Sequence, residues 1–552
     1  MNKRNLKSLL AIALISVSGF AQDLETAKKA IQDEQYDKAK AILKSLVESK
    51  PNDGINYYYL GDVLLQEEEV ESARTYFEKG IGVKGKGFLN YIGLGQLALD
   101  DNNVNLAKEN FDKALKSIRK KDYNEQLLVA SAYLNSKHSQ PKEAIAIAQA
   151  VITADYTNAS AYNVLGKAYL ADENFNEAFS AFRNAISYDE TLLDAKLQLA
   201  IITKRGRGFA EAIKACEEIL VVNPNYAPAL REIADSYYLW SLSDAVKKDA
   251  YVSKADEYYQ KYLVASGNSV ESRMKYADFL LVTGDYIKLE KEATSLSKEE
   301  GVNNRINRYL GYAGYHNANY TVAIEGLEKY LTKAKKVIGR DHLYLGLSYL
   351  NTAKDNNGHY AKGVEQLQKA VKVEPAVAEE FHSIGLDLSK KGNLKEAIDV
   401  FSVSADIKSQ SNYTYDNYYA AYCYYLLGRD DESGNNEGVL NQADKYFERA
   451  IQADSKLAEA YFFKARANRL QKGDDAYKKM FDSYNSYVRV IGDAGDLGKT
   501  ENKDRLVEAY TSIATYHANK QENNEAIVMF NKVLELDSQN EFAKSTLKAL
   551  EK

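Results

Sequence analysis

Hydrophobic and polar positions along residues 159–192 follow the pattern of two short amphipathic helices. The apolar and small residues of the first helix recur at i, i+3, i+4 and i+7, and those of the second helix recur at i, i+4 and i+7. A polar link at 172–174 interrupts the period between them, so the segment predicts a helical hairpin. The residues that form the two faces are Tyr162, Leu165, Gly166 and Tyr169, followed by Ala178, Phe182 and Ala185.

Small and large side chains are placed along this hairpin in a way that allows close packing. Gly166 and Ala178 are small enough for two helix backbones to approach, and Phe182 is large enough to fill the space between them. The same arrangement recurs in about fourteen units. We therefore expect an all-α protein built from a series of similar antiparallel helix pairs. The units begin at residues 20, 54, 88, 123, 159, 193, 227, 270, 304, 339, 378, 414, 458 and 507.

Three stretches depart from the regular spacing. Residues 240–251 and 428–441 each insert extra residues between the two helices of a unit, and the unit at 458–505 has a long tail. The 428–441 insertion is rich in Gly, Asn and Asp, so we expect a solvated loop. A calcium-binding loop is the alternative, but its acidic residues are out of register for alternating oxygen ligands. Those residues are Asp430, Asp431, Glu432 and Glu437.

The repeated unit resembles the tetratricopeptide repeat. That repeat carries an aromatic residue at position 4, Leu at 7, Gly at 8, Tyr at 11, Ala at 20, Phe at 24, Ala at 27 and Pro at 32 of a period of about 34 residues. In the unit at 159–192 all of these positions match except the last, where Glu190 stands. The resemblance implies a right-handed superhelical solenoid, in which the first helix of each pair lines a concave groove that binds partners.

The repeats and their flanks divide the chain into four expected regions. Residues 1–21 form a leader, 22–268 an N-terminal array of repeats, 269–540 a C-terminal array with inserted loops, and 541–552 a capping helix. The last segment has one polar face, which would cover the apolar end of the array, as solenoids require for solubility.

The first 21 residues have the pattern of a secretory signal peptide. Basic residues precede an apolar run from Leu9 to Val17, and the small residues Gly19 and Ala21 stand at −3 and −1 of an expected cleavage before Gln22. The apolar run is about half of the roughly 20 residues that a membrane-spanning helix needs, so a retained anchor is the weaker alternative. We therefore expect an exported, periplasmic protein that could associate with the outer membrane.

Composition excludes some classes of partner and says little about others. The net charge is −6, with lysine and glutamate mixed along the helices, which argues against a nucleic-acid surface. The two cysteines, Cys216 and Cys423, lie in distant repeats. Because each repeat of a solenoid contacts only its neighbours, we expect both to be unpaired and buried.

We recognise no catalytic or metal-binding pattern in the sequence. The six histidines are scattered without metal-ligand spacing, and no GxSxG, HExxH, Walker or GxGxxG element appears in the context that each requires. We expect no enzymatic activity, no metal and no cofactor. The alternative, an enzyme, would need convergent acid, base or metal groups, and only the irregular unit at 458–505 could hide them.

Candidate binding residues come from the groove positions that the resemblance implies, namely 2, 5, 6, 9, 12 and 13 of each unit. Most units carry mixed polar residues there, but the units at 304, 339 and 414 concentrate arginine and tyrosine. The first two contribute Arg305, Arg308, Tyr309, Tyr312, Tyr315, His316, Arg340 and Tyr344. The unit at 414 contributes Tyr415, Tyr418, Tyr419, Tyr422 and Tyr425, which we call the tyrosine stripe.

Two interpretations of these residues remain open. Tyrosine offers rigid apolar area and a hydroxyl at low entropic cost, which suits binding of an extended peptide or a glycan. Tyrosine is also abundant throughout the chain, with 43 residues, so the stripe could simply pack against neighbouring turns. In another unit, Asn163 and Lys167 superficially resemble the pair with which some tetratricopeptide domains hold a peptide carboxylate, but the neighbouring units lack matching residues.

The functional expectation follows from the resemblance. We expect a non-enzymatic scaffold for protein–protein interaction in the bacterial cell envelope, serving as an accessory subunit of an outer-membrane assembly or secretion complex. Its expected partners are other envelope proteins, including outer-membrane proteins. The alternative is a peptide- or glycan-binding module that uses the tyrosine stripe.

Overall fold

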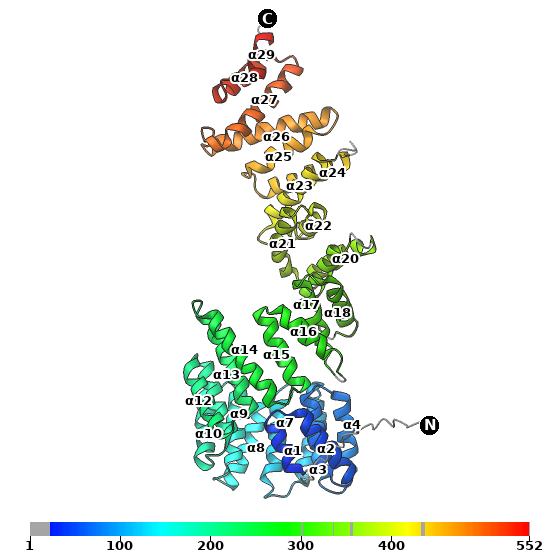
Figure 1. Cartoon of the computed structure of the whole chain (residues 1–552), viewed down its shortest axis with the longest axis vertical. Coiled ribbons are helices and arrows are strands. Elements are labelled where there is room, and N and C mark those ends of the chain that lie inside the picture. Colours follow the sequence, from blue (N-terminus) through cyan, green and yellow to red (C-terminus); the bar gives the residue numbers. More distant parts are fainter. Residues whose placement is uncertain (1–22, 300–301, 335, 354–356, 432–435, 551–552) are drawn as a thin grey trace, which may run out of the picture. The chain divides into compact units, whose positions relative to one another are not determined.

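A computed structural model describes residues 23–299, 302–334, 336–353, 357–431 and 436–550 (Figure 1). The expected signal peptide at 1–21 lies outside these residues. The chain forms two compact units, the first ending at Ile306 and the second beginning at Asn307. The division expected after residue 268 stays a prediction.

The first unit contains eight helix pairs in chain order. Its helices are α1 (Leu24–Gln32), α2 (Tyr36–Ser49), α3 (Gly54–Gln66), α4 (Val70–Ile81), α5 (Asn90–Asp100), α6 (Val104–Ser117), α7 (Tyr123–Asn135), α8 (Pro141–Ala154), α9 (Ala159–Ala171), α10 (Phe175–Tyr188), α11 (Leu193–Arg205), α12 (Phe209–Val222), α13 (Ala227–Ser243), α14 (Lys248–Ala265), α15 (Val270–Thr283) and α16 (Tyr286–Leu296).

The second unit continues the pairing through six more pairs and a final single helix. Its helices are α17 (Arg305–His316), which begins at the unit boundary, α18 (Tyr320–Lys333), α19 (Gly339–Asn351), α20 (Asn357–Val373), α21 (Ala378–Lys390), α22 (Leu394–Ser404), α23 (Tyr413–Arg429), α24 (Glu437–Ala453), α25 (Ala458–Arg469), α26 (Asp474–Asp493), α27 (Lys503–Asn519), α28 (Asn523–Leu536) and α29 (Glu541–Leu550). The described residues thus confirm the expected all-α fold of about fourteen helix pairs.

In several units the predicted contact between a glycine at position 8 and an aromatic ring at position 24 joins the two helices of the hairpin. Gly166 of α9 lies against the buried ring of Phe182 on α10, and a Cβ on Gly166 would stand 2.6 Å from that ring. The equivalent contact joins Gly61 to Phe77 and Gly385 to Phe401. At these three glycines a Cβ would overlap the aromatic ring in its present position, so a larger residue would force the ring to shift.

The turns inside nine of the described hairpins share one backbone geometry that the sequence pattern did not suggest. The residue at position 15 of a unit adopts a left-handed backbone, as Glu34 (φ 53), Ala318 (φ 59) and Gly392 (φ 80) show. Glycine adopts this conformation without strain, whereas other residues do so at a cost. The backbone of the turn is therefore bent in the same way at each of these positions, including Glu34.

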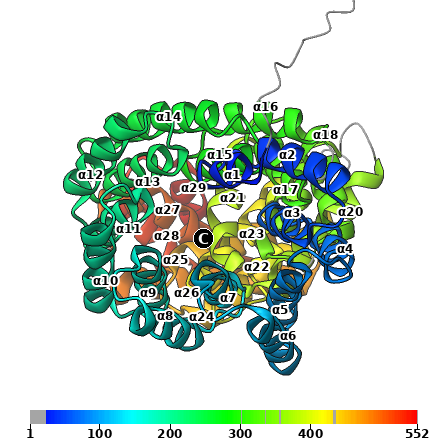
Figure 2. The same cartoon turned by 90° about the horizontal axis from the view of Figure 1, so that it is seen from below.

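Helices of the first unit form two concentric layers, seen in Figure 2. The odd-numbered helices from α1 to α15 lie on the inner side and the even-numbered helices on the outer side. The α1–α2 hairpin returns to α13, α14 and α15, so the unit completes one turn and closes on itself. The Gln35 amide donates a 2.9 Å hydrogen bond to the backbone carbonyl of Ala265, which marks this closure.

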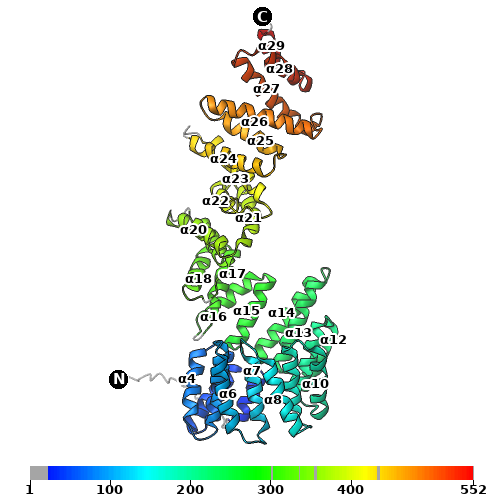
Figure 3. The same cartoon turned by 180° about the vertical axis from the view of Figure 1, so that it is seen from behind.

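The inserted stretches are more helical than expected. The insertion at 240–251 lengthens α13 and α14 and leaves only residues 244–247 as their turn (Figure 3), so this hairpin is longer than the α11–α12 hairpin before it and the α15–α16 hairpin after it. In the 428–441 insertion, α24 already begins at Glu437, while residues 432–435, including Glu432 of the calcium-loop alternative, lie outside the described residues.

Two further expectations concern the cysteines and the C-terminal helix. Cys216 and Cys423 are both unpaired and buried, which confirms the prediction, and burial raises the pKa of the Cys216 thiol to about 12. In α29, Ala543 and Leu547 are buried against the preceding helices.

Among the described residues, no helix has both the length and the apolar character needed to cross a bilayer.

Candidate functional site

The candidate residues at the start of the second unit bond mainly to the chain itself. Arg308 on α17 makes a bidentate pair with Asp341 on α19, with both nitrogen–oxygen distances at 2.7 Å. The Tyr312 hydroxyl donates a 3.0 Å bond to the same carboxylate. Tyr309 and Tyr312 are only 3% and 6% exposed. Arg305 precedes them and lines a small cavity within the first unit. These side chains therefore offer little surface to a partner.

Tyr315 and Tyr344 form a half-buried aromatic pair between α17 and α19. Their rings are stacked with centroids 4.7 Å apart, and His316 contacts the edge of Tyr344 at 5.1 Å. Arg340 on α19 is exposed and pairs with Glu380 on α21 at 2.9 Å. The Arg340 side chain is 55% exposed, in contrast to the buried Tyr309 and Tyr312.

The tyrosine stripe on α23 is graded from exposed to buried. Tyr415 is 49% exposed, whereas Tyr425 is 4% exposed. Tyr418 and Tyr422 are half-buried, and their rings are stacked at 6.2 Å with an angle of 12°. Tyr419 is also half-buried and turns towards His382 and the preceding repeat, at 5.8 Å. The accessible surface of the stripe therefore lies on Tyr415, Tyr418 and Tyr422.

The aromatic surface continues onto the next repeat, which sequence reasoning missed. The Tyr422 ring meets Phe463 on α25 edge to face at 4.8 Å, and Arg466 lies 6.0 Å from the Phe463 ring. Phe463 and Arg466 occupy positions 6 and 9 of the unit at 458, which are groove positions. The irregular tail of that unit hid this signal.

Two expected groove positions of the unit at 159 bond to the following repeat. The Asp194 carboxylate accepts bonds from Asn163 at 2.7 Å and Lys167 at 2.6 Å. Burial alone would raise the pKa of Asp194, but the charge of Lys167 and these bonds outweigh burial and lower it. The pair that resembles a peptide-carboxylate holder is therefore already occupied by a carboxylate of this chain.

Arg466 and Glu508 form an equivalent bond in the second unit, at 2.8 Å. This bond and the Arg308–Asp341 pair each join the first helices of consecutive repeats. Such charge-assisted bonds stiffen the angle between neighbouring hairpins, because both partners are held by their own helices. The first helices of these repeats, which carry the expected groove positions, are consequently tied to one another by side-chain bonds.

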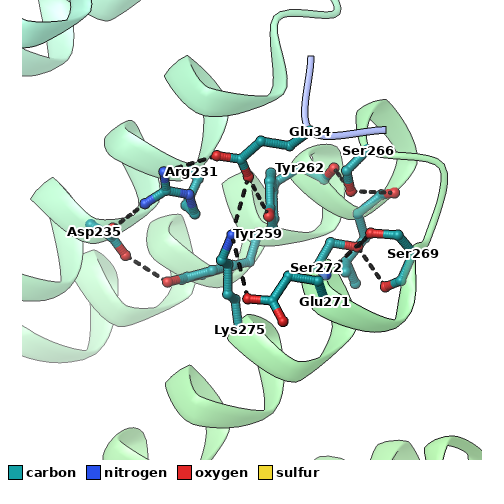
Figure 4. Close-up of polar contacts among 11 residues, drawn as sticks. Glu34, Arg231, Asp235, Tyr259, Tyr262, Ser266, Ser269, Glu271, Ser272 and Lys275 are labelled. Carbon is teal, nitrogen blue, oxygen red and sulfur yellow. Dashed lines mark hydrogen bonds and ion pairs between the residues drawn. The ribbon is translucent and has the colours of Figure 1, made fainter. Parts of the chain in front are cut away.

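The closure of the first unit is centred on Glu34, in the turn between α1 and α2 (Figure 4). Its carboxylate accepts a 3.1 Å bond from Arg231 on α13 and a 2.7 Å bond from the Tyr262 hydroxyl on α14. Lys275 on α15 lies 3.5 Å away. Burial alone would raise the pKa of Glu34, but the charges of Arg231 and Lys275 outweigh it and lower that pKa to about 2.

Further polar contacts surround this centre on the same three helices (Figure 4). The Tyr259 hydroxyl donates a 2.5 Å bond to Asp235, which also lies 3.6 Å from Arg231. Lys275 lies 3.7 Å from Glu271. One carboxylate from the first repeat thereby ties together three helices that follow it by some 200 residues in the sequence. We interpret the network as structural, because both oxygens of the Glu34 carboxylate are bonded to groups of the protein itself.

Metal binding finds no support in the residues that the structure describes. These residues contain no group of three or more His, Cys, Asp or Glu side chains that could hold a metal ion. His382 and His517 each face one carboxylate, of Asp416 and of Glu522 respectively.

Comparison with known proteins identifies the repeats. Two tetratricopeptide repeat models match the chain, one over residues 24–82 and the other over residues 159–192 and 507–540. No curated protein matches the chain.

Several solved structures are similar over part of the chain. The C-terminal part of a TPR repeat-containing protein from Cytophaga hutchinsonii is 23% identical, covers 50% of this chain and 98% of its own, and has a TM-score of 0.31. A tetratricopeptide repeat protein from Parabacteroides merdae is 15% identical, covers 46% of this chain and 93% of its own, and has a TM-score of 0.31. The pilF protein of Pseudomonas aeruginosa is 15% identical, covers 42% of this chain and 97% of its own, and has a TM-score of 0.31.

The repeat models match segments near both ends of the chain, and helix pairs of the same kind fill the described residues between them. The chain therefore carries tetratricopeptide repeats at residues 24–82, 159–192 and 507–540, within a continuous series of helix pairs.

Proposed function

We propose that this protein is an interaction scaffold of the bacterial cell envelope, and that it serves as an accessory subunit of an outer-membrane assembly or secretion complex. Tetratricopeptide repeats are typically non-enzymatic modules that bind other proteins. The envelope location is supported by the leader pattern of residues 1–21, and the proposed partners are envelope proteins.

One observation carries the scaffold proposal. The partly exposed rings of Tyr418, Tyr422 and Phe463 contact one another in a row on α23 and α25, and the exposed Tyr415 lies one helical turn before Tyr418. The Arg466–Glu508 bond holds the following repeat in place beside this row. A rigid aromatic surface loses little conformational entropy when a partner binds, so it suits recognition of another protein.

The test is recovery of partners with the tagged full chain from envelope extracts of its native host in mild detergent. We expect outer-membrane or secretion proteins in stoichiometric amounts with the wild type, and their loss with Tyr415→Ala, because Tyr415 is exposed and contributes little to packing. Tyr156→Ala is the control, since Tyr156 is 71% exposed and lies outside the groove. Recovery of the protein alone in every case would contradict the scaffold role.

The half-buried Tyr418 and Tyr422 favour a second candidate, binding of a peptide or glycan along the stripe. The hydroxyls, rather than the rings, would then supply the specific contacts. Tyr418→Phe and Tyr422→Phe preserve the ring packing and remove those hydroxyls. A soluble glycan that raises the melting temperature of the wild type and not of the double variant would support this candidate. Equal shifts in both proteins would argue against it.

A further inference from the structure

The α13–α14 hairpin is longer than the hairpin that follows it. Its helices have 17 and 18 residues, whereas α15 and α16 have 14 and 11. The rings of Trp240 and Tyr251 stack at 4.4 Å across the extended part, and Tyr237 stacks with Trp240 at 6.4 Å. These contacts hold the extension as a rigid helical projection (Figure 3).

The side of this projection that faces α15 and α16 is hollowed into a cleft of about 330 Å³. Its floor is apolar and consists of Phe279 and Leu280, which are 4% and 1% exposed, together with Val252. A cleft of this size admits a long side chain with part of its backbone, and its floor suits an aliphatic stem.

The charged groups that line the cleft are predominantly acidic. Asp249, Asp256 and Asp285 contribute three carboxylates, and Lys288 is the only cation among the lining residues, all of which the structure describes. The Lys288 amine lies 3.1 Å from Asp256 and 3.0 Å from Asp285. Lys248 precedes Asp249 but does not line the cleft. The lining therefore carries an excess of negative charge.

Large apolar side chains stand exposed around the same end of the two hairpins. Leu242 and Val246, at the tip of α13 and α14, are 62% and 95% exposed. Val282, at the end of α15, and Ile287, at the start of α16, are 57% and 78% exposed. Exposed apolar residues grouped beside a cleft are typical of a surface that another protein covers.

We propose that this cleft binds a basic, amphipathic segment of a protein partner. A lysine or arginine of the segment enters the cleft with its stem on Phe279 and its charge beside Asp249 and Asp256. Apolar residues of the segment cover Val246 and Ile287. The acidic lining selects a basic partner, because an acidic segment would add like charges without compensation. This inference rests on the proposed scaffold function and names one docking surface of it.

The test is selection of a random peptide display library on the immobilised full chain, followed by fluorescence anisotropy with the selected peptides. We expect enrichment of lysine or arginine next to aliphatic residues. Asp249→Lys should weaken binding at least tenfold and Ile287→Ser several-fold. Both side chains are exposed, so the melting temperature should stay unchanged. The matched controls are Glu218→Lys and Val221→Ser on the outer helix α12, where the same changes should leave affinity unaltered.

Two results would overturn the inference. Selected peptides without basic residues, or an absence of enrichment, would show that the cleft does not recognise this chemistry. Basic peptides that bind Asp249→Lys and Ile287→Ser as well as the wild type would show that they use another surface. In that last case the scaffold function would stand and the cleft assignment would fail.

Discussion

Glu34 shows how much the structural role of a residue depends on what the fold brings to it. Its position in a polar turn is unremarkable in the sequence, yet the folded chain surrounds it with Arg231, Tyr262 and Lys275. Glu34 is 8% exposed, so its negative charge is stabilised only while these partners stay in place.

Replacing Glu34 with Gln should destabilise the first unit by about 1–3 kcal/mol at pH 7, because Arg231 and Lys275 lose the charge that compensates them and both are partly exposed. The lowered pKa of Glu34 means that its contribution is complete above about pH 4.5 and is lost as the pH falls towards 2. In urea unfolding, the free energies of unfolding of the wild type and Glu34→Gln should therefore differ less at pH 3 than at pH 7. Glu48→Gln, at an exposed site on α2, is the control. Equal differences at both pH values would contradict the role of the charge.

Gly166 is a second position where one atom decides the packing. Gly166→Ala places a Cβ 2.6 Å from the Phe182 ring, which must shift, so we expect a loss of about 1–3 kcal/mol in thermal or urea unfolding. Gly438→Ala is the matched control, because nothing lies within 4 Å of its Cβ position on α24. That change should be neutral or stabilising by up to about 1 kcal/mol. Similar losses at both sites would show that helix propensity, rather than the ring contact, is measured.

At the scale of the element, the hairpin turn is the most regular feature that the apolar pattern did not reveal. Apolar spacing locates helices, but it does not report the sign of φ at position 15, since the residues there are as different as Glu34, Ala318 and Gly392. The geometry follows from the close antiparallel approach of the two helices and not from the residue itself.

This geometry predicts opposite effects at two equivalent turns. Ala318→Gly should stabilise the second unit by up to about 1 kcal/mol, because an alanine with φ 59 carries left-handed strain. Gly392→Ala should destabilise it by about 1 kcal/mol for the same reason, although nothing lies within 4 Å of the added Cβ. Differential scanning calorimetry of both variants checks the signs. Two shifts in the same direction would argue against a common turn conformation.

At the scale of the whole molecule, the closure of the first unit defines how much chain it needs. Lys275 belongs to α15, so a chain that ends at residue 268 cannot complete the contacts of Glu34. Such a chain would also lack α15, which packs against α14. A chain that ends at Ile306 retains every residue of the closure.

We therefore expect fragment 22–306 to unfold cooperatively in circular dichroism and fragment 22–268 to melt at a lower temperature with a broader transition. The missing residues include buried apolar side chains such as Met274 and Phe279, and their removal exposes apolar surface on α13 and α14. Identical transitions for the two fragments would show that the repeats before 268 form a complete unit.

The sequence by itself determined the number of hairpins, their register, the glycine–aromatic contacts and the unpaired cysteines. All of these depend on spacings within one repeat or between neighbours, and a solenoid propagates them along the chain. It also identified the tyrosine stripe, but not which of its rings are exposed, since Tyr415 and Tyr425 occupy similar positions in the pattern and differ in burial.

Only the tertiary structure decided the closure around Glu34, the extension of the stripe to Phe463 and the cleft beside α14. Each of these depends on small angles between repeats that add up over many hairpins, or on an insertion that becomes helical because stacked aromatic rings support it. The apolar period of a single repeat carries no information about such accumulated geometry, and this is why residues distant in sequence meet where local spacing could not predict it.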